Sequence, residues 1–290
     1  MNLRKVRRLI QETFQEWQAD KASLIAAALA YYTVFSISPL LVIAVAIAGA
    51  FFGEQTAQAQ ITEQLTELIG EDGAQPILLA LNNMSQPKIR GIASLVSIGV
   101  LLLGASGIFA QLQNALNVVW NVKPQPGKGV WTFIRKRIYS FFMVLAIGLL
   151  LVLSLILSAV VSTVSKYQLD FLPGSVNLWG NLDTLVSLGL MTFLFCLMFK
   201  YVPDVKIAWK DVIVGSFITA LLFLFGKFLL SVYISQGSLG SAYGAAGSLI
   251  VFLAWVYYTF QTILLGAEFT QVYTRLYGSK VRPRKNSQID

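Results

Sequence analysis

Long apolar runs separated by short polar segments dominate this 290-residue chain. A helix needs about 20 predominantly apolar residues to cross the hydrocarbon core of a bilayer. Runs of about that length or longer predict six membrane-spanning helices, at about 24–52, 91–113, 138–164, 182–202, 212–234 and 248–273. The pattern therefore predicts an all-α, polytopic integral membrane protein whose residues 1–290 form a single membrane domain.

Shorter amphipathic patterns lie outside these runs. In the segment 55–84, Ile61, Leu65 and Ile69 share one helical face, which predicts a surface helix on the outer side, followed by a second one near Pro76. Either can act as a lid or brace without touching a ligand. The leader carries apolar residues at helical spacing among basic ones, which predicts a helix lying in the cytoplasmic interface. These residues are Val6, Ile10, Phe14 and Trp17.

Composition agrees with a membrane environment. The chain is 56% hydrophobic and 12% charged, whereas soluble domains carry about 25% charged residues. The first apolar run follows a charged leader and is about twice as long as the apolar part of a signal peptide, so we expect it to be retained. The single cysteine, Cys196, excludes an intrachain disulfide and is expected to pack as a small apolar residue.

The placement of the positive charges predicts the orientation. The leader, the 123–137 segment, the 200–210 turn and the basic tail 275–290 carry most of the lysines and arginines, whereas the opposite side has only Lys88, Arg90 and Lys166. The positive-inside rule then puts both termini in the cytoplasm, near anionic headgroups. Because the cations are spread over four segments beside membrane ends, nucleic-acid binding is disfavoured.

Two charged residues inside the predicted spans are candidates for a substrate or ion path. Lys227 lies 15 residues after Val212, about 22 Å along the helix, in the outer half of the bilayer. It can extend its amine to the outer headgroups or pair with Asp183, near the outer end of the fourth predicted span. Glu268 lies toward the cytoplasmic end of the sixth, and buried charges of this kind are costly.

Carboxamides accompany Glu268. Gln261 and Gln271 fall near its helical face, and the second predicted span ends with Gln113 and Asn117 one turn apart. These side chains can be glue between helices or line a cavity open to the cytoplasm. We include Lys227, Asp183, Glu268, Gln261, Asn117 and Gln113 in the candidate path.

The first apolar run is interrupted in "AAALAYYTVFSISPLL". A helix over 22–52 is about 46 Å long against a hydrocarbon core of about 30 Å, so it must tilt, bend or protrude. Pro39 removes a backbone donor and predicts a kink beside Ser36 and Tyr32. These three residues are candidates for a gate, because bent helices with polar groups at mid-depth recur at transport sites, although many helices simply bend.

This sequence lacks the residues that most enzyme mechanisms need. Histidine is absent, one cysteine cannot form a thiolate cluster, and no GxxxxGK[ST] phosphate loop or G-x-S-x-G elbow occurs. We therefore expect no catalytic residues, no metal site, no cofactor and no enzyme activity.

Four segments in order resemble the YihY/BrkB family of bacterial inner-membrane proteins. They are "AAALAYYTVFSISPLL", "GASGIFAQLQNALNVVWNV", "YVPDVKIAWKDVIVGS" and "SAYGAAGSLIVFLAWVYYTFQTILLGAEF". The resemblance implies a six-helix, multi-pass protein of the bacterial cytoplasmic membrane, in a family described as virulence-factor-like or transport-related. The family has also carried a ribonuclease label, which the residue inventory disfavours because no loop could hold catalytic metal ions.

The leading hypothesis is a transporter or flippase-like protein for an envelope amphiphile or small solute. Lacking an ATP motif, such transport would be passive, ion-coupled or driven by a partner. The alternative is a non-transporting scaffold that supports envelope integrity through segment 55–84. Under either hypothesis, the expected partners of the protein are the bilayer and its anionic lipids, together with other copies of the chain in a homo-oligomer.

Overall fold

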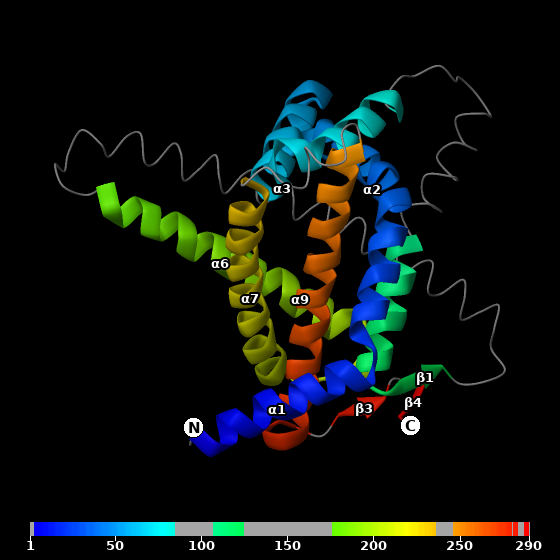
Figure 1. The fold of residues 1–290 in the computed structure, drawn as a ribbon, viewed down its shortest axis with the longest axis vertical. Helices are drawn as coiled ribbons and strands as arrows, with labels where there is room; N and C mark the ends of the chain where they lie inside the picture. The colour runs from blue at the N-terminus through cyan, green and yellow to red at the C-terminus, as the bar shows by residue number, and fades with distance from the viewer. Residues whose placement is uncertain are drawn as a thin grey trace.

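The computed structural model describes residues 3–84, 107–124, 176–235, 246–279, 281–283 and 287–289, which are mostly α-helical (Figure 1). The helices are α1 (Leu3–Ala19), α2 (Ala22–Phe52), α3 (Glu54–Met84), α6 (Val176–Tyr201), α7 (Trp209–Ser235) and α9 (Gly247–Tyr277). A further helical segment covers 107–119. Both chain ends lie at one end of the helix bundle, called here the α1 end.

Two helices are long and apolar enough to cross a bilayer, over Trp209–Leu230 and Gly247–Tyr277. A third candidate is α2, if its two halves form one bent span. The predicted spans at 212–234 and 248–273 thus match α7 and α9. The predicted span at 138–164 and most of that at 91–113 lie outside the described residues. The total of six and the cytoplasmic termini remain predictions.

The outer face of α7 suits a lipid environment. Large apolar side chains on this face are not covered by other described helices. They are Ile213, Val214, Phe217, Leu221, Phe225, Phe228, Leu229 and Val232. An apolar surface that continues over a whole helix is unusual on a soluble monomer. It matches the low charge content of the chain and supports the assignment of α7 as a membrane-spanning helix.

Helices α7 and α9 pack closely through a reciprocal pair of glycines and threonines. A Cβ added to Gly215 would overlap Thr270, and one added to Gly266 would overlap Thr219. Each threonine hydroxyl donates back to its own helix, Thr219 to the Gly215 carbonyl at 2.7 Å and Thr270 to the Gly266 carbonyl at 2.6 Å. Small residues that let two backbones approach are the usual contact between membrane helices.

Helix α2 is bent by 47° between Ala22–Ile37 and Leu40–Ala50. The bend falls where the sequence has Pro39, whose ring cannot donate the helical hydrogen bond. At its start, α2 follows α1 through Lys21, which has a left-handed backbone (φ 54°, ψ 41°). This conformation lets the chain turn sharply from α1 into α2.

Helix α3 covers the end of the bundle opposite α1 (Figure 1). Its backbone breaks at Gly70 (φ 77°, ψ 167°), so the second helical part starts there and contains Pro76 within it. The apolar face predicted for the first part is buried at Ile61 and Ile69, whereas Glu63 is exposed. The amphipathic face of α3 therefore packs onto the bundle.

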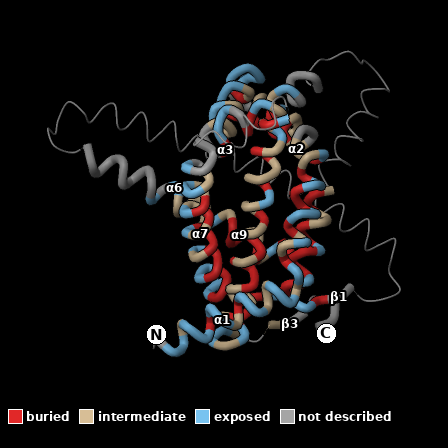
Figure 2. The backbone as a smooth tube through the Cα atoms, viewed as in Figure 1, coloured by how far each residue is buried: buried red, intermediate tan, exposed pale blue. Residues whose placement is uncertain are grey.

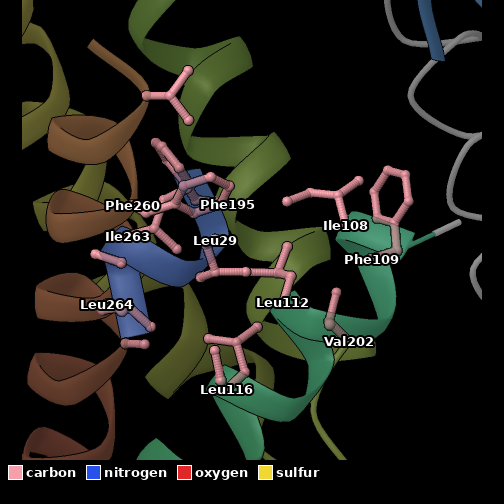
Figure 3. Close-up of a cluster of buried hydrophobic side chains, with 14 of the residues drawn as sticks. Leu29, Ile108, Phe109, Leu112, Leu116, Phe195, Val202, Phe260, Ile263 and Leu264 are labelled. Atoms are coloured by element: carbon pink, nitrogen blue, oxygen red, sulfur yellow. The ribbon is translucent and has the colours of Figure 1, made fainter. Parts of the chain in front are cut away.

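An apolar layer joins four helices in the middle of the bundle. Figure 3 shows Leu29 of α2, Leu112 and Leu116 of segment 107–119, Phe195 of α6 and Leu264 of α9 in this layer. Figure 2 shows buried positions lining the inner sides of these helices. The layer therefore forms an apolar core between these helices.

The C-terminal tail adds two small antiparallel sheets at the α1 end, which the sequence analysis did not predict. Strand β3 (Arg282–Pro283) pairs with β2 (Val205–Lys206), and β4 (Ser287–Ile289) pairs with β1 (Val122–Pro124). The basic tail therefore connects the loops that follow segment 107–119 and α6.

Candidate functional site

Glu268 occupies a core position of α9. The buried stripe of this helix contains Phe260, Leu264, Glu268 and Val272, each one turn from the next. Glu268 is 1% exposed, and its Oε1 has no hydrogen-bond partner among the described residues. Sequence periodicity alone would place an apolar residue here. An ionisable group in this stripe is the most unusual feature of the bundle.

The carboxyl group of Asp20 faces the carboxyl group of Glu268 at hydrogen-bonding range. Asp20 is the last residue before Lys21, so the turn between α1 and α2 places it against the end of α9. The first turns of α2, which follow directly in the chain, carry small buried side chains at Ala22 and Ala26. We call Asp20 and Glu268 the carboxyl pair.

Charged residues of α1 surround the carboxyl pair without neutralising it. Arg275 donates to Glu16 at 2.7 Å and to Glu12 at 3.1 Å, and Arg8 donates to Glu12 at 2.6 Å. Arg275 is thus engaged with the two glutamates of α1, and these ion pairs hold α1 on the end of α9. The ion pairs between described residues include neither Asp20 nor Glu268.

The titration of α1 reflects this network. The hydrogen bond from Arg8 is the main cause that lowers the pKa of Glu12, helped by Arg275. Burial is the main cause that raises the pKa of Asp20; the Glu268 contact lowers it and the charge of Glu16 raises it. Two facing carboxyl groups cannot both ionise cheaply, so the pair favours a state that holds one proton.

Further polar atoms are buried without a hydrogen-bond partner among the described residues. Trp17 Nε1 and Gln271 Oε1 lie toward the α1 end, whereas Gln261 Oε1 lies two turns before Glu268 on α9. The amide of Gln261 donates to Tyr257 Oη at 2.6 Å. Buried polar atoms of native proteins are rarely left without partners, so these atoms require an explanation.

Gln113 and Asn117 belong to a different, fully bonded cluster around Asp204. Asn117 Nδ2 donates to Asp204 Oδ2 at 3.0 Å, and the Asp204 backbone N–H donates to Asn117 Oδ1 at 2.8 Å. Gln113 Nε2 donates to Asp204 Oδ1 at 3.3 Å. These bonds tie segment 107–119 to the loop after α6. Of the two roles that the sequence left open, the contacts favour glue over a cavity lining.

Lys227 lies far from Glu268 along the bundle. Its neighbour Gly226 packs against the hydroxyl of Tyr258, ten residues or about 15 Å before Glu268 on α9. The ion pairs between described residues do not include Lys227. The side chain of Asp183 lies outside the described residues, so the predicted Lys227–Asp183 contact stays a prediction.

The residues predicted as a gate lie at or near the bend of α2. Ser36 is buried and packs near Gly107, at the start of segment 107–119. Tyr32 is partly exposed and stacks edge-on with Tyr31. The side chain of Pro39 lies outside the described residues. Their role as a gate stays a prediction.

Comparison with known proteins finds a family match over nearly the whole length of the chain. The sequence profile of the family described as virulence factor BrkB matches residues 13–289. The chain belongs to the virulence factor BrkB family. This confirms the resemblance carried by the four sequence segments.

Relatives of this BrkB-family chain are named as membrane proteins. A UPF0761 membrane protein of Methylibium petroleiphilum is 28% identical over 279 residues, 89% of this chain and 64% of the relative. One of Ralstonia nicotianae is 27% identical, covering 92% and 58%, and one of Psychromonas ingrahamii is 27% identical, covering 87% and 83%. The chain thus spans about three-fifths of the first two relatives. No solved structure matches it.

Sequence reasoning missed Asp20 and Asp204. Asp20 is the last acidic residue before the first apolar run, and Asp204 follows Pro203 in a turn otherwise rich in lysine. Both signals are visible in the sequence, but their partners, Glu268 and Asn117, lie on distant segments. Within the described ranges, no group of three or more metal-ligating side chains gathers at one place.

Proposed function

We propose that this membrane protein is a multi-pass transporter or flippase-like protein of the bacterial cytoplasmic membrane, acting on an envelope amphiphile or small solute. The observation that carries the proposal is the carboxyl group of Glu268, buried in a membrane-spanning helix and without an ion pair among the described residues. Ionisable groups inside membrane spans are costly and mark substrate or ion pathways. A purely structural helix contact would place an apolar side chain here.

The bend of α2 supports the same proposal. Bent or broken helices next to polar groups are a recurrent feature of transport sites. The 47° bend lies in α2, the helix that begins two residues after Asp20. Movement of the first half of α2 about the bend would therefore move Asp20 relative to Glu268.

The exposed face of α1 suits contact with a membrane surface. Ile10 is 60% and Phe14 50% exposed, beside the exposed Arg7 and Arg4. An amphipathic helix with basic residues beside its apolar face binds in the headgroup region and is attracted by anionic lipids. We propose that α1 lies in the cytoplasmic interface, which places the carboxyl pair just beneath the headgroups.

A lipid-translocation assay tests the proposal. The purified chain is reconstituted in liposomes that contain a fluorescent anionic phospholipid, and chemical quenching from outside counts the molecules that cross. We expect faster crossing than in empty liposomes, and loss of this gain with Glu268→Gln. In parallel, lipids that co-purify in native nanodiscs are identified by mass spectrometry. Crossing at the empty-liposome rate, together with a bulk lipid profile, would contradict the flippase-like function.

The scaffold alternative needs a different test from deletion of α3, because Ile61 and Ile69 of this helix belong to the core. Charge reversal of the exposed Glu63 and Glu71 leaves the buried face intact. The transporter proposal predicts that envelope phenotypes follow Glu268→Gln and not Glu63→Arg/Glu71→Arg. The reverse pattern would favour a scaffold that works through the outer surface of α3.

A further inference from the structure

We infer that the Asp20–Glu268 carboxyl pair is the proton-binding site through which this protein couples proton movement to transport, so that its driving ion is H⁺. The inference rests on the proposed function and deepens it by naming the ion. It is carried by the contact between the two carboxyl groups, by the complete burial of one of them, and by the lack of a partner for Glu268 Oε1 among the described residues.

Charge balance requires a proton at this place. Two carboxylates at hydrogen-bonding range in a water-poor environment repel each other strongly, whereas one carboxylic acid can donate to one carboxylate. The donor that satisfies this contact is then the proton itself. At Asp20, burial raises the pKa, while the hydrogen bond with Glu268 lowers it, as expected for an Asp20 carboxylate that accepts from a protonated Glu268.

The surroundings select a proton over a metal cation. Na⁺ or a divalent cation in place of the proton would need several further oxygen ligands, and no group of three or more carboxylate, histidine or cysteine side chains gathers at the pair among the described residues. The charged groups that act on Glu268 within the described part of the chain are Asp20 and Glu16 of α1 and Arg275 of α9. Arg275 is already bound to Glu16 and Glu12. Helix α7 faces this part of α9 with Gly215 and Thr219, which are uncharged.

The exchange of the proton takes place toward the α1 end. On the other side, Leu264 lies one turn from Glu268 and belongs to the apolar layer with Leu29 and Leu112 (Figure 3). On release, the carboxyl O–H bond breaks, the proton passes to water at the α1 end, and the pair gains one negative charge. The two carboxylates then repel, which pushes the turn at Lys21 away from α9.

Infrared difference spectroscopy tests the site without any substrate. The full chain in lipid nanodiscs is titrated between pH 5 and 10, and the band of protonated carboxyl groups above about 1,700 cm⁻¹ is followed. We expect a band that is lost as the pH rises in the wild type and is missing in Glu268→Gln. Glu63→Gln, at an exposed site on α3, is the matched control and should keep the band. Equal elution on size exclusion verifies that each variant folds.

Asp20→Asn sharpens the test. Removing the facing carboxylate withdraws the repulsion that favours the bound proton, so the band should disappear at a pH lower by about one unit or more. An identical band in wild type and Glu268→Gln, or no effect of Asp20→Asn, would overturn the inference.

The same preparations distinguish the two proposals. A Glu268 band in a protein that moves no lipid or solute probe would leave the proton site standing and contradict the proposed function. Transport that continues in Glu268→Gln, with the band missing, would overturn the coupling while leaving transport intact. Proton-linked transport predicts that the pH dependence of transport follows the loss of the band.

Discussion

Two polar clusters occur at the same end of the bundle, and they differ in one respect. The Asn117–Asp204 cluster uses its hydrogen-bonding groups on one another, with three bonds that join two segments. The carboxyl pair joins α1 to α9 but leaves Glu268 Oε1 without a partner. A satisfied polar network rigidifies a structure, whereas an unsatisfied buried group is a cost that stability alone does not explain. We therefore assign the first cluster to structure and the second to function.

Breaking the satisfied cluster has the largest expected effect. Asp204→Ala removes the acceptor of both Gln113 and Asn117 and leaves their buried amides unpaired. Hydrogen bonds to charged groups are worth about 1.5–3 kcal/mol each, so we expect the free energy of unfolding to fall by about 3 kcal/mol. Chemical unfolding of the purified protein measures it. Asp204→Asn retains part of the acceptor capacity, so its free energy of unfolding should fall by less. An equal fall in both variants would argue against a role for these hydrogen bonds.

A change at the α7–α9 contact should disturb the carboxyl pair without disturbing the Asp204 cluster. Gly266→Val forces a side chain into Thr219, and overpacking of this kind costs about 1–3 kcal/mol. Because Gly266 lies two residues from Glu268, the carboxyl pair should be displaced while the Asp204 cluster stays formed. Thermal unfolding and the infrared carboxyl band measure both effects. Gly189→Val in α6, where an added Cβ would meet no other described atom within 4 Å, is the control and should be neutral.

A change of pH should alter the stability of α1 docking by a smaller amount, and the direction of this change can be stated for each acid. The lowered pKa of Glu12 means that its stabilising contribution is present at neutral pH and is lost as the pH falls through the folded value. The raised pKa of Asp20 has the opposite sense: docking weakens as the pH rises from the unfolded value through the folded one. Rate-corrected amide exchange of α1 should therefore be slowest at mildly acidic pH.

Asp20→Asn is the control for this pH profile. It should remove the weakening at higher pH and leave that at low pH, because only the second depends on Glu12. A profile unchanged by Asp20→Asn would show that the carboxyl pair does not influence the docking of α1.

The smallest expected effect is that of Arg275→Gln. This arginine is partly exposed, and exposed ion pairs contribute at most about 1 kcal/mol. We expect slightly faster amide exchange in α1 and little change in the unfolding of the bundle. Arg4→Gln, at an exposed site without a described ion pair, should change neither. A large destabilisation by Arg275→Gln would mean that α1 is part of the core.

Much of the fold follows from local patterns in the sequence. The ends of α2, α7 and α9 agree with the apolar runs within a few residues, and Glu268 stands out as an acid within one of them. The bend of α2 coincides with Pro39 because the missing backbone donor is a local property. Periodicity and breaker residues act over a few turns, so they can be recognised without knowledge of the tertiary structure.

The contacts that define the candidate site could not be predicted in this way. Asp20 meets Glu268, and Asp204 meets Asn117, only because the chain returns to the same end of the bundle. A helical face shows that a side chain is turned inward but does not identify the residue opposite. The short strands of the tail are set by backbone pairing with distant loops, for which β3 and β4 carry no clear sequence signal.

We infer that Glu268 is kept for function and Asn117 for structure. The most direct test compares the unfolding temperatures of Glu268→Gln and Asn117→Ala with the wild type in the same nanodiscs at neutral pH. We predict that Glu268→Gln unfolds at the wild-type temperature or higher, because replacing a buried ionisable group kept for function commonly stabilises a protein, and that Asn117→Ala unfolds several degrees lower. A decrease for Glu268→Gln as large as that for Asn117→Ala would contradict it.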